Sequence, residues 1–285
     1  MSTTVNGAIQ QTPFGREARP LDGKRVINYW KDGHIGFIEM DDPPANTYTH
    51  EMMRQLDEAI LDARFDHEVE VIVLAGKGEK FFSAGANIGM LNAVTPEFKY
   101  MFCLHANETL SRLEQTPKLV IAALNGHCVG GGLEIAMAAD LRIARKDAGK
   151  IGLPEVALGV LPGTGGTQRL ARLVGKSRAI EMMTSGKTVS YEQAFEWGMI
   201  NDLFEGNAEE FREQITNYAR QFCSPNKAPM AVGHIKRSVQ TGAELPLQDA
   251  LALERELQSL LFKSEDAKEG LAAYNEKRVA RFKNK

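Results

Sequence analysis

The sequence predicts an α/β protein that ends in a helical region. Apolar runs of strand length alternate with segments of helical periodicity as far as Thr167. Beyond that point the apolar spacing is mostly helical, and a polar, proline-containing stretch from Ser224 to Pro229 indicates a boundary. We therefore divide the 285 residues into an N-terminal arm (1–25), a core (26–224) and a helical C-terminal region (225–285).

The predicted core begins with two strands, a helix and a third strand. Asp32-Gly33 separates the first two apolar runs and is typical of a hairpin turn. Met52, Leu56 and Ile60 have the spacing of one helical face. The predicted bounds are 26–30 (strand), 35–40 (strand), 49–64 (helix) and 69–75 (strand).

A run of small residues, FFSAGANI from Phe81 to Ile88, follows the third strand. Ala84, Gly85 and Ala86 leave the backbone N–H groups of this run accessible to a ligand. Most runs of this kind are only turns. The run indicates an oxyanion hole only if a second turn with free N–H donors lies beside it. A long helix is predicted next, over residues 96–114.

The centre of the sequence is a buried strand that leads into three consecutive glycines. The apolar run 119–124 is the strand, and Gly130, Gly131 and Gly132 follow it. Glu134 then opens an apolar segment that suits a packed helix. The first N–H groups of a helix are unpaired and carry partial positive charge, which favours an oxyanion. Together with the FFSAGANI run, this turn could supply two converging donors.

A second carboxylate, Glu155, precedes another glycine-rich turn from Pro162 to Thr167. Taken alone, Glu134 is most simply a first-turn helix acid and Glu155 a surface acid. Taken with the two donor turns, they match what acid–base addition across a polarised bond requires. The residues by themselves leave both interpretations open.

Composition excludes several classes of protein. A net charge of −3 gives no reason to expect nucleic acid, and six His and three Cys show no zinc-binding spacing. No apolar run approaches the roughly 18–20 residues of a membrane span, so no membrane partner is predicted. The odd cysteine count and the polar N-terminus predict a reducing, cytoplasmic location, with an organellar matrix left open.

The motifs together resemble those of the crotonase (enoyl-CoA hydratase/isomerase) superfamily, and the chain is identified as a hydratase-like member. The matching blocks are FFSAGANI, NGHCVGGGLEIAMAAD, LPEVALGVLPGTGGTQRL and the C-terminal EKRVARF. The chain departs from the family pattern at Asn87 (usually Asp), at Ala280 (usually Pro) and by one extra residue near Asp147. The resemblance implies a spiral of ββα units followed by a helical C-terminal oligomerisation region.

The resemblance also implies a reaction and a substrate. The expected enzyme is an enoyl-CoA hydratase, a lyase of fatty acid metabolism that adds water across the trans-2 double bond to give a 3-hydroxyacyl-CoA. Coenzyme A is then part of the substrate, and no separate cofactor or metal is expected. The expected assembly is a homotrimer or a dimer of trimers (a hexamer).

Residue roles follow by position from the same resemblance. The backbone N–H groups of Ala86 and Gly131 would form the oxyanion hole. Glu134 would deprotonate the attacking water and Glu155 would deliver a proton to C2. The Gly163 N–H would help to hold the water. Coenzyme A would be lined by Ala45, Ala84, Asn87 and Ile88.

Other functions compete with the hydratase. Within the family they are an enoyl-CoA isomerase and an acyl-CoA hydrolase; outside enzymes, the competitor is an RNA-binding relative. The RNA-binding alternative would rest on the basic residues near the C-terminus, Lys277, Arg278, Arg281, Lys283 and Lys285. Nucleotide binding is disfavoured because Leu170 stands where a P-loop needs its first glycine.

The acyl group cannot be read from the sequence with the same detail. Met90 and Met101 are predicted to line the acyl pocket, although an ordinary core helix would explain Met101 equally well. No Lys or Arg lies between Met90 and Lys99, which predicts an uncharged acyl chain of short or medium length. The chain length itself and the physiological direction stay open.

Overall fold

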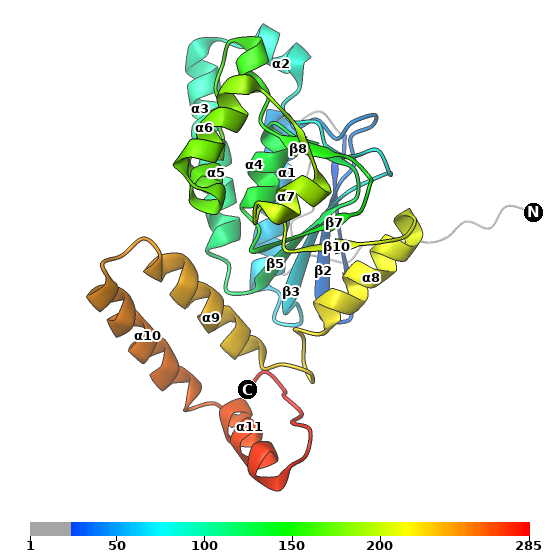
Figure 1. Ribbon diagram of the computed structural model, residues 1–285. Coiled ribbons are helices and arrows are strands. Elements are labelled where there is room, and N and C mark those ends of the chain that lie inside the picture. Colours follow the sequence, from blue (N-terminus) through cyan, green and yellow to red (C-terminus); the bar gives the residue numbers. More distant parts are fainter. Residues whose placement is uncertain (1–23) are drawn as a thin grey trace, which may run out of the picture.

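The computed structural model describes residues 24–285. The predicted arm therefore lies outside the described residues except for its last two positions. The rest of the chain folds into a sheet-containing core and a group of C-terminal helices that extends away from it (Figure 1). This arrangement confirms the predicted α/β class with a helical C-terminal end.

The larger sheet has six strands in the order β1-β2-β3-β5-β7-β10. All neighbouring pairs are parallel except the β1–β2 hairpin. Because parallel strands are buried on both faces, these strands read as continuous apolar runs, and every residue of β2 is buried. The strands are β1 (Ile27–Asp32), β2 (Ile35–Met40), β3 (Val71–Gly76), β5 (Leu119–Leu124), β7 (Leu141–Arg145) and β10 (Asp202–Phe204).

A second sheet of four short strands, in the order β4-β6-β8-β9, lies beside the first. Successive strands alternate between the two sheets: β3, β5 and β7 enter the larger one, and β4, β6 and β8 enter the smaller one. This alternation is the spiral that the family resemblance implies. The short strands are β4 (Phe81–Ser83), β6 (His127–Val129), β8 (Lys150–Gly152) and β9 (Val189–Ser190).

Helices cover both faces of the larger sheet. On one face, α8 packs Phe211, Ile215 and Ala219 against the sheet; on the other, α1 and α4 complete the main core (Figure 1). The helices of this part are α1 (His50–Phe65), α2 (Ile88–Ala93), α3 (Pro96–Glu114), α4 (Gly131–Met137), α5 (Gly166–Val174), α6 (Lys176–Ser185), α7 (Tyr191–Glu196) and α8 (Ala208–Arg220), together with the 3₁₀ turn η1 (Glu155–Leu158).

The chain ends in three helices, α9 (Pro229–Gly242), α10 (Leu247–Leu261) and α11 (Glu265–Glu276). Their attachment to the core includes an ion pair between Lys236 Nζ of α9 and Asp140 Oδ2, 2.9 Å apart, with Lys236 almost fully buried. The Asp140 carboxylate also accepts the Val120 N–H at 2.7 Å, so the start of β5 and α9 share one anchor. Within residues 24–285 no helix is long and apolar enough to cross a membrane.

Several element boundaries match the sequence prediction, and the differences concern short elements. Strands β9 and β10 lie in the part of the chain that was predicted to be mostly helical, and no strand was predicted there because runs of two or three residues carry no recognisable alternation. The six-residue helix α2 follows the FFSAGANI run directly, capped by the Asn87 side chain, which accepts the Met90 N–H at 2.9 Å. Helix α5 begins at Gly166, inside the glycine-rich turn that the sequence places from Pro162 to Thr167.

Candidate active site

The two predicted donor turns meet in the structure. A Cβ added to Gly85, whose φ is +87°, would lie 3.0 Å from the Gly131 nitrogen at the start of α4. Neither the Ala86 N–H nor the Gly131 N–H has an acceptor within residues 24–285. Unpaired, adjacent backbone donors are what an oxyanion hole requires. The structure therefore brings together Ala86 and Gly131, which lie 45 positions apart in the sequence (131 minus 86).

Glu134 lies in the first turn of α4 with its carboxylate at the start of another helix. Its Oε1 accepts the N–H groups of Thr164 and Gly166, each at 2.7 Å. Helix α5 has no capping side chain of its own at Gly165, so Glu134 satisfies an orphan donor there. Burial raises the pKa of the Glu134 carboxyl, and the Gly166 and Thr164 N–H groups act in the opposite direction.

Glu155 opens the turn η1 directly after Pro154 and faces the same space. Its Oε1 lies 3.1 Å from where a Cβ on Gly130 would stand, next to the donor turn. Its Oε2 is buried and has no hydrogen-bond partner among the described residues. Burial, reinforced by the negative charge of Glu134, raises the pKa of Glu155 to about 7. A carboxyl with this pKa carries its proton over much of the neutral range and can donate it.

Gly163 lies in the loop that leads from η1 into α5. Its N–H has no acceptor within residues 24–285, as the predicted role of holding a water requires. The side chain of Cys103 on α3 closes this loop from outside, since a Cβ on Gly163 would stand 3.1 Å from Cys103 Sγ. The prediction for Gly163 concerned the water alone; the contact with α3 could not be read from the sequence.

The four residues predicted to line coenzyme A are clustered. The Ala84 N–H donates to the Ala45 carbonyl at 2.9 Å, which pairs the two segments along the chain. Asn87 has a structural role as the cap of α2 and also donates to Thr47 Oγ1 at 3.3 Å. Ile88, the next residue, is about half exposed. Their contact with coenzyme A stays a prediction.

The two residues predicted to line the acyl pocket have different surroundings. Met90 packs against the main core, whereas Met101 on α3 is 62% exposed. At 100° per residue, Met101 stands about 200° around α3 from Cys103, the residue that touches the Gly163 loop. The structure therefore brings Met90, but not Met101, close to the packed interior.

Lys99 and Tyr48 belong to the site but were not predicted from the sequence. Lys99 Nζ lies 5.2 Å from the centre of the Phe102 ring, and its charge lowers the pKa of both Glu134 and Glu155 against the effect of their burial. The stretch of α3 that was predicted to be apolar thus ends in a cation at the site. The signal was present in the sequence, because a lysine one turn before Cys103 shares its helix face.

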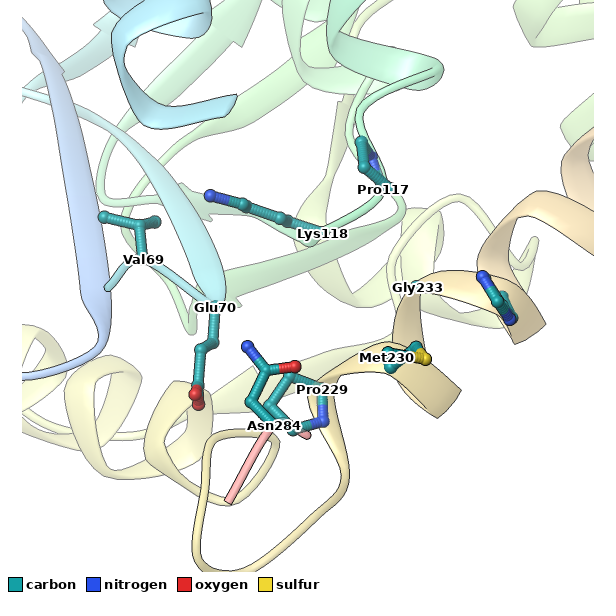
Figure 2. A pocket seen from close by; sticks show the side chains of 9 residues that line it. Val69, Glu70, Pro117, Lys118, Pro229, Met230, Gly233 and Asn284 are labelled. Carbon is teal, nitrogen blue, oxygen red and sulfur yellow. The ribbon is translucent and has the colours of Figure 1, made fainter. Parts of the chain in front are cut away.

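A separate cavity of about 160 Å³ lies where the C-terminal region meets the core (Figure 2). None of the predicted site residues lines it; its walls include Val69, Glu70, Pro117 and residues of α9. The Lys118 ammonium at its edge donates to the carbonyls of Ala63 and Asp66, and burial lowers its pKa to about 8. No group of three or more His, Cys, Asp or Glu side chains within residues 24–285 is placed to hold a metal ion.

Two unpaired backbone donors lie beside one buried and one partly buried carboxylate, which are the groups that polarising a carbonyl and moving protons next to it would require. The family model described as enoyl-CoA hydratase/isomerase matches residues 31–285, and the chain belongs to this family. The sequence-based family assignment is therefore confirmed.

Individual relatives agree with this assignment along nearly the whole chain. A short-chain-enoyl-CoA hydratase of Clostridium acetobutylicum is 35% identical over 259 residues, which is 90% of this chain and 97% of the relative. A crotonyl-CoA hydratase of Syntrophomonas wolfei is 33% identical over 256 residues, 90% of this chain and 96% of the relative. A crystal structure described as "Enoyl-CoA hydrates" from Geobacillus kaustophilus is 46% identical with a TM-score of 0.88, covering 92% of this chain and 98% of that one.

Proposed function

We propose that this chain is an enoyl-CoA hydratase that adds water across the trans-2 double bond of an enoyl-CoA thioester. The observation that supports this best is the contrast between the two carboxylates. Glu134 Oε1 accepts two backbone N–H groups, whereas Glu155 is partly buried and its Oε2 has no hydrogen-bond partner among the described residues. Hydration needs one base and one acid at the same double bond, and this pair supplies both.

Each residue then has a role in the addition. The N–H groups of Ala86 and Gly131 bind the thioester oxygen, each contributing about 3–4 kcal/mol to transition-state stabilisation. Water held by Gly163 attacks C3 and gives its proton to Glu134, while the C2–C3 electron pair moves toward the thioester as an enolate. Glu155 then donates its proton to C2, and the product is a 3-hydroxyacyl-CoA. Exchange with solvent then removes the proton from Glu134 and returns one to Glu155, which restores both groups.

The C-terminal basic residues give the RNA-binding alternative little support. The Arg278 guanidinium binds the carboxylates of Glu269 and Glu276. The Lys283 N–H donates to Asp266, so the end of the chain folds back onto α11. Part of this basic set is therefore already neutralised or packed.

The test is a panel of trans-2-enoyl-CoAs with different acyl chains, monitored for loss of the conjugated thioester and for 3-hydroxyacyl-CoA by mass spectrometry. We expect hydration of at least one member. A surface change on α6, Glu181→Gln, is the matched control and should leave the rate unchanged. Release of free coenzyme A, or a shifted double bond without added water, would instead indicate a hydrolase or an isomerase.

The acyl group is proposed to be an uncharged chain of short or medium length. Met90 is partly buried against the main core and follows Asn87 and Ile88, so if it lines the acyl pocket, Met90→Ala should change the ratio of kcat/KM for short against longer enoyl-CoAs by about 10-fold. Met101→Ala is the matched comparison, and with Met101 largely exposed we expect a smaller change. If both variants fold and keep the parent's chain-length profile, the acyl group is bounded elsewhere. Preference for a dicarboxylyl-CoA would contradict the proposal and direct attention to Lys99.

We further propose that residues 225–285 assemble the chain into a trimer or a dimer of trimers. Exposed apolar side chains on α9 include Ile235 and Val239, each more than 60% exposed, and an apolar groove of about 390 Å³ runs between α9, α10 and α11. Surfaces of this kind mark protein contacts. Light scattering at micromolar concentration should give at least three chains, and Ile235→Asp should weaken assembly more than the neighbouring Arg237→Asp. A folded monomer would contradict this proposal.

Cytoplasmic location and a place in fatty acid metabolism stay predictions.

A further inference from the structure

Tyr48 lies beside each part of the site that the proposed function uses. Its N–H donates to the Gly85 carbonyl at 2.9 Å, and its carbonyl accepts the Asn87 N–H at 3.0 Å. These two bonds flank Ala86 on both sides. Because successive residues of an extended segment direct their N–H groups to opposite sides, the Ala86 N–H points away from Tyr48. The backbone of Tyr48 thus fixes the direction of the first oxyanion donor.

The ring of Tyr48 packs directly against the second donor. A Cβ on Gly131 would stand only 1.9 Å from Tyr48 Cε1, so the ring occupies the space that any larger residue at 131 would need. Tyr48 is 2% exposed, and the Phe102 ring of α3 lies beside it with centroids 5.6 Å apart. The ring is therefore buried in contact with both Gly131 and α3.

The hydroxyl of Tyr48 reaches the loop that holds Glu134. Tyr48 Oη lies 3.0 Å from Thr164 Oγ1, and the Thr164 N–H donates to Glu134 Oε1 at 2.7 Å. Thr164 is 1% exposed, so its hydroxyl has no access to water in place of Tyr48. Either hydroxyl can be the donor in this contact, and the Thr164 side chain also acts on the Glu134 carboxyl, whose pKa it lowers.

We propose that Tyr48 and Thr164 form a positioning pair that fixes the two oxyanion donors relative to the Glu134 base. Neither residue touches the reacting atoms; the pair acts through the orientation of Gly131 and of the Thr164 loop. This inference rests on the proposed hydratase function. It gives Tyr48 and Thr164 a positioning role that is separate from the proposed roles of the oxyanion hole and the two carboxylates.

The pair also supports the negative charge of Glu134. Burial raises the pKa of the Glu134 carboxyl, and hydrogen bonds from Thr164 oppose that rise. Other titratable or charged groups near this space are Glu155 on η1, Lys99 and Cys103 on α3, Arg169 on α5, which donates to the Thr164 carbonyl at 3.2 Å, and Tyr48, whose own pKa burial raises, so that its hydroxyl stays neutral. Loss of the hydroxyl contact should therefore raise the Glu134 pKa and move the acid limb of kcat/KM to higher pH.

The experiment uses Tyr48→Phe, Thr164→Val and the double variant. Each single change removes one hydroxyl and keeps the shape of the side chain. We expect kcat to fall about 10-fold to 10²-fold with a smaller change in KM, and the acid limb to shift upward. The double variant should be no worse than the poorer single variant, because both changes break one contact. Tyr29→Phe is the matched control: its buried hydroxyl has no hydrogen-bond partner among the described residues, and its loss should leave kcat unchanged.

The outcomes separate this inference from the proposed function. Absence of hydration by the unmodified chain contradicts the function and the pair together. Hydration by the unmodified chain with unchanged kcat and pH profile in both single variants overturns the pair alone. Additive losses in the double variant also overturn it, since they would mean two independent contributions. If Tyr48→Phe does not fold, Thr164→Val alone decides, because it leaves the Tyr48 ring against Gly131.

Discussion

Glu134 and Glu155 are the same kind of side chain in one site, but the regions that hold them are built differently. Glu134 sits between two helix starts, where the Thr164 and Gly166 N–H groups stabilise its charge. Glu155 sits on a short 3₁₀ turn with one oxygen buried and unpaired among the described residues. Burial raises the pKa of both carboxyls; the Thr164 and Gly166 N–H groups oppose that rise for Glu134, whereas for Glu155 the opposing backbone hydrogen bond comes from its own N–H.

The difference shows how one fold can present a base and an acid made of the same group. When the surroundings of two carboxyls give them different pKa values, one can act as a base and the other as an acid although both are the same chemical group. The proposed roles, Glu134 as the base and Glu155 as the acid, rest on the two N–H groups that Glu134 accepts and on the unpaired Oε2 of Glu155 among the described residues. Since the two carboxyls interact, their measured titrations describe the pair rather than each residue separately.

Removing the charge of Glu134 should have the largest effect. In Glu134→Gln the amide oxygen can still accept the Thr164 and Gly166 N–H groups, so the fold is expected to be kept. Loss of the base should lower kcat for crotonyl-CoA about 10²-fold or more. Steady-state kinetics checks this, with Glu181→Gln as the surface control. A near-normal rate would show that Glu134 is only the cap of α5.

The raised pKa of Glu155 should affect the pH dependence of protein stability as well as the reaction rate. The pKa of Glu155 is raised from 4.5 to about 7 in the folded state, so its stabilising contribution is complete below about pH 4.5 and is lost as the pH rises through 7. Glu155→Gln has no such proton to lose. The melting temperature of the variant relative to the unmodified chain should therefore rise between pH 5 and pH 8. A constant difference across that range would mean that Glu155 is not a buried acid.

Removing Lys99 should change the pKa values of Glu134 and Glu155 in the same direction, with a smaller effect on activity than the loss of either carboxyl. Its cation lowers the pKa of Glu134 and of Glu155, so Lys99→Ala should move both limbs of the kcat/KM profile to higher pH, by less than about one unit. Lys80→Ala is the matched control, because Lys80 also lies over a ring, that of Phe81, at 5.5 Å. Equal profiles for the two variants would exclude Lys99 from the site.

The fold could be predicted largely because its long elements carry local signals. Thr95 and Pro96 begin α3 as a cap and a first-turn proline, and the predicted bounds 96–114 match the structure. The apolar run 119–124 likewise matches β5. Strands β9 and β10 escaped prediction because pairing with distant strands, rather than local pattern, creates them.

The site likewise contains residues that could be predicted from local motifs and contacts that could not. Glu134, Glu155 and the two glycine turns could be predicted because they lie within recognisable motifs. The contact between Tyr48 and Thr164 could not, since 116 positions separate the two residues and neither has a local pattern that refers to the other. Met101 shows the opposite case: helical spacing alone did not reveal which face of α3 is turned toward the site.

Glu134 is proposed to act as the base and Glu155 as the proton donor. The most direct test of this assignment is the pH dependence of hydration in the unmodified chain and in Glu155→Gln. With a pKa of about 7 for the acid, kcat/KM of the unmodified chain should decline about 10-fold per pH unit above neutrality as Glu155 loses its proton. The variant should be slower by about 10²-fold or more, and its remaining activity should show no decline in that range. A flat alkaline profile in the unmodified chain, or the same decline in the variant, would contradict the assignment of Glu155 as the proton donor.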